Sequence, residues 1–456
     1  MSAPPVRVLV PAGMLGAGFT AESIERGIAL GAHVIAIDGG STDSGPAYLA
    51  TASAKMPAEA IAADLELMLD AGARAGIPVI IGSAGTSGTD AGVDWVAGIV
   101  EAIARAGKLR LRIARIYSEQ SIERMSSALA AGKISPLAPA EPLDLAVLRR
   151  CEHVVGLMGA EPIIAALEQG ADVIVAGRAT DTALIAAVPL MRGCPPGASW
   201  HAAKIAECGN QCTTNPRGGG VLVAIDDTGF TVEPLDANAA CTPRSVAAHM
   251  IYENSDPFVM REPPGSLNVA DASYTAVDDR VVRVTGSAFS DAPYTVKLEG
   301  AGRAGYQTLA IVGIRDPEVL GAIDEWSSTL RGFLELKIKD LLGLEPADYN
   351  LELRCYGWNA VLGEIDPDTT TPPREVGATL LVTADTQETA TKIVKISNPY
   401  LLHMPIARMN HLPCYAFMAS PAEIERGPIH EFLLQHVVSV DAPDELFRTT
   451  INEIGT

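Results

Sequence analysis

The sequence predicts a mixed α/β fold whose first part is a mostly parallel, doubly wound sheet. From Val6 to about Arg192, short runs that are apolar throughout alternate with amphipathic helical segments. Such strands are typical of a parallel sheet that is covered by helices on both faces. Two of the runs, Val34–Ile37 and Ile77–Ile81, lead into loops rich in Gly, Ser, Thr and Asp. Because periodicity does not distinguish an open sheet from a closed one, a βα barrel-like arrangement is the alternative.

The boundaries of the elements follow from these runs and from the segments between them. The expected strands of the first part are Val6–Val10, Val34–Ile37, Val79–Ile81, Leu109–Ile116, His153–Leu157 and Val173–Val175. The expected helices between them are Ala21–Leu30, Pro57–Ala75, Gly92–Ala106, Ile122–Ala131, Leu143–Arg150, Pro162–Glu168 and Asp181–Met191.

The pattern changes after Pro195-Pro196-Gly197. Val221–Ala224 and Phe230–Val232 indicate a hairpin, and Thr242 with Pro243 indicates a capped helix start. Further on, the strands expected at Tyr294–Leu298, Thr308–Ile314, Tyr349–Cys355 and Gly377–Ala384 and the helices at Pro317–Leu342 and Thr386–Leu402 suggest a ferredoxin-like α+β sandwich. We therefore expect a parallel α/β domain (1–240), a ferredoxin-like domain (241–402) and an irregular extension (403–456) that packs on the others.

Composition limits the classes of function. The chain has 456 residues, 48% of them hydrophobic and 5% aromatic, and a net charge of −21. This charge argues against nucleic acid and against an anionic membrane surface, since both require basic patches. The start of the chain has no signal-peptide pattern and no apolar run approaches about 20 residues. Seven scattered cysteines are typical of free thiols in the cytoplasm, which is the location we expect.

The first candidate site follows the run Val34–Ile37. Asp38 at the end of a buried strand can act as a general base, and the polar side chains of the loop after it can bind a substrate. The loop residues are Ser41, Thr42, Asp43 and Tyr48. The alternative is that Asp38 stabilises the turn and that Ser41 or Asp43 caps a helix.

A second candidate is the glycine-rich loop Gly82–Asp90. Its backbone N–H groups, before a helix, can bind the carboxylate or phosphate of a substrate, and Gly85, Thr86, Ser87 and Gly88 are its candidate residues. The loop matches neither a phosphate-binding loop of nucleotide hydrolases nor a dinucleotide fingerprint. The alternative is a flexible turn.

Further candidates come from later strand ends. Arg178, after the run Ala171–Ala176, can hold a carboxylate through two hydrogen bonds, although an ion pair with Asp181 is the alternative. Lys297 is a candidate substrate contact near the start of the α+β segment, and the alternative is an exposed strand-end charge. Asn210, Gln211 and Thr213 are candidate substrate contacts.

Metal binding and nucleophilic catalysis have weaker signals. Cys208 and Cys212 are two thiols without a second Cys or His pair, whereas zinc is usually bound by four ligands. We therefore expect no metal site. Cys208 has no obvious base beside it in the sequence, so a buried, inert thiol is the simpler interpretation.

Four segments resemble the acyclic terpene utilisation AtuA family. They are GADVIVAGRATDTALIAAVPL (Gly170–Leu190), IAECGNQCTT (Ile205–Thr214), CTPRSVAAHMIYENSDP (Cys241–Pro257) and VADASYTAVDDRVVRVTGS (Val269–Ser287). Lys297 and the pair Gly305-Tyr306 follow in the family's style, and the likeness extends from Val34 to Leu402. The tail Phe417–Val438 is similar to a longer branch of the family, whose members often accompany a small separate protein.

The resemblance implies degradation of branched acids, which are handled as coenzyme A thioesters. We therefore expect an enzyme that acts on a small branched or unsaturated acid or its thioester, as a lyase of hydratase or dehydratase type. Asp38 or Asp43 would move a proton, the Gly82–Gly88 amides would stabilise an enolate, and Arg178 would hold the distal or thioester end of the substrate. Asp181 is the remaining candidate catalytic residue. Coenzyme A is expected as part of the substrate, and no other cofactor is implied.

Other interpretations stay open. The irregular tail is consistent with a half-site or non-catalytic subunit that works with a small partner protein. An acyl transferase or hydrolase that uses Cys208 is a further alternative. A nicotinamide oxidoreductase is disfavoured, because the loop from Pro11 to Gly18 lacks the dinucleotide spacing. We also expect a homo-oligomer.

Overall fold

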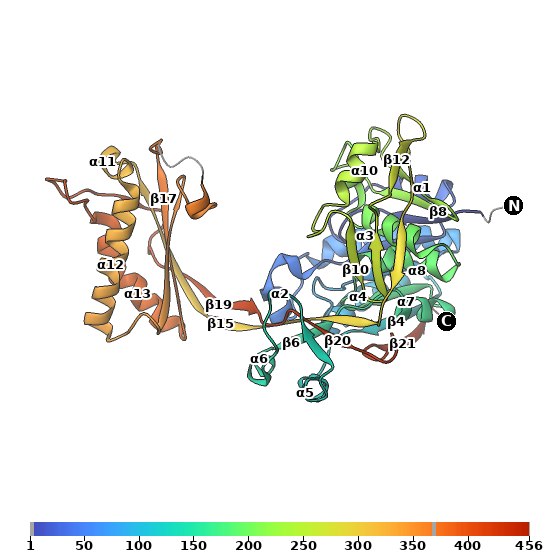
Figure 1. Ribbon diagram of the computed structural model, residues 1–456, viewed down its shortest axis with the longest axis horizontal. Coiled ribbons are helices and arrows are strands. Elements are labelled where there is room, and N and C mark those ends of the chain that lie inside the picture. The colour runs from blue at the N-terminus through green and yellow to red at the C-terminus, as the bar shows by residue number, and fades with distance from the viewer. Residues whose placement is uncertain (1–3, 367–370, 456) are drawn as a thin grey trace. The chain divides into compact units, whose positions relative to one another are not determined.

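The computed structural model describes residues 4–366 and 371–455. Two compact units make up the chain: Met1–Gly302 with Phe432–Thr456 form unit 1, and Arg303–Glu431 form unit 2. Both units combine helices and strands, so the expected mixed α/β class is confirmed (Figure 1). In the described residues, no helix is both long and apolar enough to cross a membrane.

A ten-stranded sheet forms the centre of unit 1. Five neighbouring strands pair in parallel, in the order β1 (Val6–Val10), β2 (Val34–Asp38), β3 (Val79–Gly82), β7 (Val173–Ala176) and β4 (Leu111–Tyr117). These strands are short and apolar, and four of the five lie within one residue of their expected bounds. Their carboxyl ends lie at one edge of the sheet, where ligands of open α/β folds usually bind.

Antiparallel strands extend the sheet on both sides. Beyond β1 come β8 (Val221–Asp226), β9 (Gly229–Pro234), β13 (Val282–Thr285) and β12 (Ser273–Ala276). Beyond β4 comes β21 (Arg448–Ile454), which pairs with β4 along its whole length. The strand order ends at β12 and at β21, so this sheet is open. The expected hairpin after the first part is confirmed by β8 and β9.

Helices pack on both faces of the sheet because side chains of each strand alternate between them. Ile35 and Ile37 of β2 belong to a core shared with α1 (Ala21–Ala29), α3 (Ala58–Ala75) and α4 (Asp90–Gly107). Val34 and Ala36 belong to the core on the opposite face. That core includes residues of α7 (Glu161–Glu168), α8 (Asp181–Met191) and α9 (Pro196–Ala206).

Smaller elements of unit 1 complete these layers. Helix α10 (Pro243–His249) begins with a capping box between Thr242 and Ser245, which confirms the expected cap. The other short helices are α2 (Pro46–Ala50), α5 (Ile122–Ala130) and α6 (Leu145–Arg149). A three-stranded sheet comprises β10 (Val259–Glu262), β11 (Gly265–Asn268) and β14 (Ala288–Asp291).

One 20-residue strand, β15 (Thr295–Ile314), replaces the two separate strands expected there. Its first residues pair within unit 1 with β6 (His153–Gly156) and β20 (His436–Ser439), and β20 pairs with β5 (Ile134–Pro136). β6 was expected in the parallel sheet, but it pairs antiparallel with β15 instead. A run of only four residues does not specify its partner strand, since a short apolar run fits any strand that is buried on both faces.

In unit 2, β15 lies beside β17 (Val376–Ala384), which pairs with β16 (Tyr349–Tyr356). β18 (Ala416–Phe417) and β19 (Ile424–Phe432) also pair with β15. The core lies between this sheet and the helices α12 (Ile323–Leu342) and α13 (Gln387–His403), and α11 (Pro317–Leu320) precedes α12. Figure 1 shows both long helices beside β17.

The C-terminal segment differs from the irregular extension that the sequence predicts. Residues 403–456 contain the four strands β18 to β21, and β21 is an edge strand of the large sheet. The strand Arg448–Ile454 has mostly polar residues and is half exposed or exposed along its length. An edge strand without a buried face has no strong apolar alternation, which explains why it was missed.

Gly220, just before β8, allows this strand to approach the end of β1. A Cβ atom at this position would lie 1.9 Å from the Val10 carbonyl oxygen, a backbone atom held in the sheet. We predict that Gly220→Ala lowers the free energy of unfolding by at least about 2 kcal/mol. The matched control is Gly98→Ala in α4, where no atom lies within 4 Å and alanine favours the helix. Chemical denaturation of both variants tests this, and equal stabilities would contradict it.

Candidate functional site

A pocket of about 620 Å³ lies at the carboxyl edge of the parallel strands in unit 1. It is lined by residues from the loops that follow β1 and β2, from the start of α8, from the segments that follow α9 and α10, and from the segment just before β8. The lining residues are Pro11, Ala12, Gly13, Met14, Ala17, Gly18, Asp38, Gly40, Ser41, Asp43, Ser44, Lys55, Asp181, Cys208, Asn210, Gln211, Pro216, Arg217, Gly218, Tyr252 and Glu253. This is where the sequence predicts a site.

Asp38 is the last residue of β2 and is 7% exposed. Its Oδ2 accepts a hydrogen bond from the Gly40 N–H at 3.1 Å, whereas its buried Oδ1 has no hydrogen-bond partner among the described residues. Burial, together with the charge of Asp181, raises the pKa of Asp38 well above its ordinary value, and Arg178 opposes this more weakly. Asp38 therefore holds a proton more strongly than a surface aspartate does.

Asp181 is the first residue of α8, directly after Thr180 at the N-cap. Its Oδ1 lies 3.3 Å from Nη1 of Arg178, and its side chain is 30% exposed. Burial raises the pKa of Asp181, while Arg178 lowers it in part. The positive end of the helix also favours the charged carboxylate. Asp38 and Asp181 are thus two interacting carboxyl groups that line one pocket, and they do not ionise independently.

Arg178 does not line the pocket, although the sequence predicted it to hold a substrate carboxylate. It is 6% exposed, and its Nε donates to Oε2 of Glu299 at 3.0 Å. Its Nη1 donates to Oγ of Ser83 at 3.1 Å and to the Ala179 carbonyl at 3.0 Å. The alternative interpretation, an ion pair with Asp181, is present.

Glu299 also contacts Thr42 and Lys297, two further residues that the sequence predicted to bind the substrate. Its Oε2 accepts from Oγ1 of Thr42 at 3.0 Å, and its Oε1 lies 3.1 Å from Nζ of Lys297. Burial alone would raise the pKa of Glu299, but Arg178 and then Lys297 lower it to about 2. Thr42 and Lys297 do not line the pocket. The hydroxyl of Thr42 is buried, whereas the side chain of Lys297 is 44% exposed, as expected for a charge on an exposed strand end.

The loop after β3 does not line the pocket, but it contacts the segment after β2 that does. Gly85, Thr86, Ser87 and Gly88 are all buried. A Cβ atom on Gly88 would lie 2.0 Å from the Arg178 backbone nitrogen, so this glycine allows a close packing contact. The side chain of Thr86 accepts from the Lys55 N–H at 2.9 Å, and Ser87 Oγ donates to the Tyr48 carbonyl at 3.2 Å. These contacts hold the loop that follows β2 in place.

Of the remaining residues that the sequence predicted to be in the site, some line the pocket and others do not. Ser41, Asp43, Asn210 and Gln211 line the pocket. Thr213 is buried, does not line it and donates to the Asn210 carbonyl at 2.8 Å. Tyr48 does not line it either and contacts the loop after β3 through its carbonyl.

Two cations in the pocket were missed by the sequence analysis. Lys55 and Arg217 are both exposed, and neither forms an ion pair with a carboxylate in residues 4–366 or 371–455. Nζ of Lys55 donates to Oγ of Ser44 at 3.1 Å. Arg217 lies in the polar, glycine-rich segment before β8. A single cation in a loop gives no signal in a sequence, because most such residues are simply solvated.

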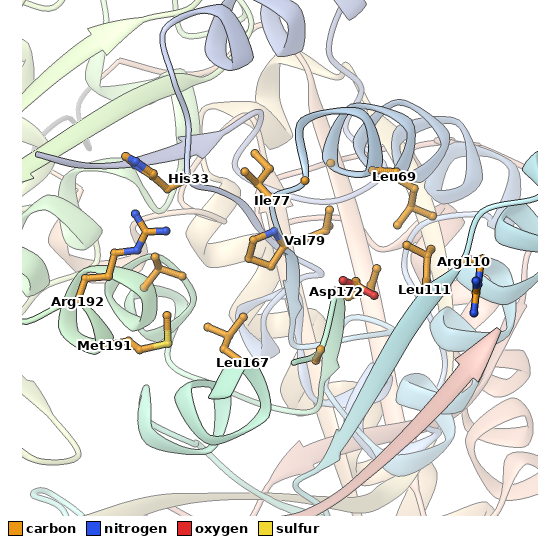
Figure 2. Close-up of a pocket in the computed structure, with 17 residues that line it drawn as sticks. His33, Leu69, Ile77, Val79, Arg110, Leu111, Leu167, Asp172, Met191 and Arg192 are labelled. Atoms are coloured by element: carbon orange, nitrogen blue, oxygen red, sulfur yellow. The ribbon is translucent and has the colours of Figure 1, made fainter. Parts of the chain in front are cut away.

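A second pocket, of about 340 Å³, lies at the opposite edge of the parallel strands (Figure 2). His33, Arg110 and Arg192 line it, together with mainly aliphatic side chains. Asp172 also lines this second pocket, and its carboxylate already accepts a hydrogen bond from the backbone N–H of Arg112 at 2.7 Å. We place the candidate site at the carboxyl edge, because that pocket contains the interacting carboxyl pair.

The fold and the site define an α/β protein with a polar, ligand-sized pocket at the carboxyl ends of parallel strands. The model of the acyclic terpene utilisation family protein AtuA matches residues 45–422. The chain therefore belongs to the AtuA family, as its sequence motifs predicted. No curated protein and no solved structure matched the chain.

Arg178 and Glu299 allow a direct test of a structural role. We predict that Arg178→Met destabilises the protein by about 3 kcal/mol, because it removes the buried ion-pair partner of Glu299 and leaves this carboxylate only the half-exposed Lys297 and the hydroxyl of Thr42. The exposed Arg192→Met is the control. Thermal unfolding followed by circular dichroism is the measurement. A variant that keeps the wild-type melting temperature would show that Arg178 is not structurally required.

The buried carboxyl group of Glu262 should make the free energy of unfolding depend on pH. It is 8% exposed and accepts from Oγ1 of Thr180 at 3.0 Å and of Thr182, at the start of α8. Burial, opposed by these two hydroxyls, raises the pKa of Glu262 from 4.5 to about 7. Protonation of this group therefore stabilises the fold below about pH 4.5, and this contribution is lost as the pH rises through about 7.

We predict that the stability of the wild type relative to Glu262→Gln falls by roughly 3 kcal/mol between about pH 4.5 and 8. Urea denaturation of both proteins at several pH values measures the difference. A difference that is constant over this range would contradict the raised pKa of Glu262.

Proposed function

We propose that the protein is an enzyme of the hydro-lyase type, which adds water to or removes it from a small branched or unsaturated acid or its coenzyme A thioester. The interacting pair Asp38 and Asp181 in one pocket is the observation that carries this proposal. Burial raises the pKa of both carboxyl groups, and the charge of Asp181 raises that of Asp38 further, so that one can act as an acid while the other acts as a base. Water elimination requires both.

The environments suggest which group holds the proton. Asp38 is the more buried of the two and has an oxygen without a partner, so it is the general acid. Asp181 contacts Arg178 and the start of α8, so it is the ionised general base. This refines the expectation from the sequence, in which Asp38 or Asp43 was the base. Asp43 is exposed, and its carboxylate accepts from Ser41 Oγ at 2.5 Å.

In the dehydration direction, Asp181 takes the proton from the carbon next to the acyl carbonyl. The electron pair of that C–H bond forms the double bond as the C–O bond of the neighbouring carbon breaks. Asp38 gives its proton to the departing hydroxyl, which leaves as water. Afterwards Asp181 is protonated and Asp38 ionised, and the pair resets by exchanging a proton with water. Hydration is the reverse sequence.

Lys55 and Arg217 support an anionic substrate. Because both lack a carboxylate partner among the described residues, they are available to a carboxylate or to the phosphates of coenzyme A. The net charge of −21 repels anions at long range, so local cations are needed. Asn210 and Gln211 line the same pocket, and their amides can donate to an acyl oxygen.

We also propose a doubly wound sheet for unit 1 and a ferredoxin-like sandwich for unit 2. The parallel order β1-β2-β3-β7-β4 with helices on both faces supports a doubly wound sheet in unit 1. In unit 2, the order β16-β17-β15 with β19 on the other side of β15, and the two helices on the sheet, support a ferredoxin-like sandwich.

Activity measurements on carboxamide variants test the proton transfer. We predict that Asp38→Asn and Asp181→Asn each lower kcat by roughly 10²–10⁴-fold, because each removes one half of the acid–base pair without changing its size. Asp227→Asn, an exposed carboxylate in the turn between β8 and β9, is the control. The assay follows the ultraviolet absorbance of the double bond in short branched enoyl thioesters. Full activity of Asp38→Asn would exclude the proposed acid.

Binding measurements test the substrate class separately. A ligand present at about a hundred times its Kd stabilises the protein by about 2.7 kcal/mol. We predict this stabilisation by branched acyl-coenzyme A thioesters or the matching free acids. Lys55→Met and Arg217→Met should weaken binding by about 10-fold each, as expected for a lost charged hydrogen bond. A thermal-shift series over both ligand sets is the measurement, and wild-type affinity in both variants would contradict the assignment.

A further inference from the structure

Three side chains with metal-binding atoms meet beside the pocket. Glu207 follows α9, Cys208 comes next in the chain, and His249 is the last residue of α10. A carboxylate oxygen of Glu207, Sγ of Cys208 and a ring nitrogen of His249 all lie within 4.8 Å of one another. Cys208 also lines the pocket. The sequence analysis missed this group because His249 comes from a different helix.

His249 provides an independent observation. It is 5% exposed, and its buried Nε2 has no hydrogen-bond partner among the described residues. Leaving a buried polar atom unpaired costs about 1–3 kcal/mol. Burial, and then Lys204, lower the pKa of His249 to about 4, so the ring is neutral at pH 7, the form that binds metals.

Catalysis by the Cys208 thiol is not supported by the same surroundings. Burial, and then the neighbouring Glu207, raise the pKa of Cys208. A thiol nucleophile needs the opposite shift, because the thiolate is the reactive form. A bound cation reverses this situation, since it displaces the proton of a coordinating thiol.

We propose that Glu207, Cys208 and His249 bind one Zn²⁺ ion, or a similar divalent transition-metal ion, and leave a fourth position open. Three protein ligands and one open position are the arrangement of catalytic zinc sites. With metal–ligand bonds of about 2.0–2.3 Å, tetrahedral ligand atoms lie roughly 3.3–3.8 Å apart. Because the three atoms lie within 4.8 Å of one another, shifts of at most about 1–1.5 Å bring them to these distances. Thiolate and imidazole favour zinc, copper or iron over magnesium and calcium.

Lys204 and Tyr252 position the proposed ligands. Nζ of Lys204 donates to Oε1 of Glu207 at 2.5 Å and to the Tyr252 carbonyl at 2.8 Å. The Tyr252 ring stacks on His249 with 5.4 Å between the ring centroids. Such contacts fix the orientation of metal ligands. The thiolate supplies one negative charge to a divalent ion, and the Glu207 carboxylate is shared between that ion and the ammonium of Lys204.

The test uses the full chain after treatment with a chelator, without substrate, so its outcome is independent of the proposed reaction. Calorimetric titration with Zn²⁺ should show binding of one equivalent. Titration with Co²⁺ should give a near-ultraviolet thiolate-to-cobalt band and the visible bands of a tetrahedral ion. Cys208→Ser should abolish the near-ultraviolet band. His249→Gln should weaken binding by at least about 100-fold, since loss of supporting contacts alone costs about 10–100-fold.

Cys414→Ser is the matched control, because Cys414 is an exposed thiol in unit 2 and the more accessible adventitious ligand. It should keep the cobalt band and the affinity of the wild type. If His249→Gln fails to fold, the cobalt titration of Cys208→Ser still tests the proposal. This variant should fold, because serine is similar in size to the half-buried cysteine that it replaces. Absence of stoichiometric binding by the wild type, or an unchanged cobalt band in Cys208→Ser, would overturn the proposal.

Discussion

The buried guanidinium of Arg178 determines how the candidate site is assembled. It binds Ser83 after β3, Asp181 at the start of α8 and Glu299 in β15, and Glu299 in turn holds Thr42. Four segments that are far apart in the sequence are thereby fixed at the carboxyl edge of one sheet. A buried charge is tolerated only when it is fully paired, so these contacts constrain one another. The geometry of the two aspartates in the pocket depends on this network.

Burial and proximity give the two aspartates properties that neither would have alone. Asp38 ends a strand where water is largely excluded, and Asp181 lies close enough to raise its pKa further. Arg178 contacts Asp181 and so moves the negative charge of the pair toward that residue. The pocket thus combines two interacting carboxyl groups with two cations that have no ion-pair partners in the described part of the chain. In a protein with a net charge of −21, such cations attract an anion only locally.

Much of the fold could be predicted from the sequence, and the site in part. The strand Val6–Val10 and the helix Asp181–Met191 have their expected bounds, because apolar runs and caps are local signals. Asp38 and Asp181 could be predicted as candidate site residues because they come at or after the ends of buried strands, and their role stays a prediction. Arg178 was assigned to the substrate because the sequence does not reveal its pairing with Glu299, 121 residues away. Lys55, Arg217 and His249 were missed for the same reason: their neighbours come from distant segments.

The measurement that tests the central claim most directly is the titration of Asp38 itself. Carbon-13 NMR of protein labelled at aspartate carboxyl groups, with Asp38→Asn to assign the signal, gives its pKa in the wild type and in Asp181→Asn. The account predicts a pKa well above the ordinary value of about 3.9 and a decrease when the charge of Asp181 is removed. An Asp38 signal that titrates near 3.9 in both proteins would contradict a shared proton and the acid–base pair built on it.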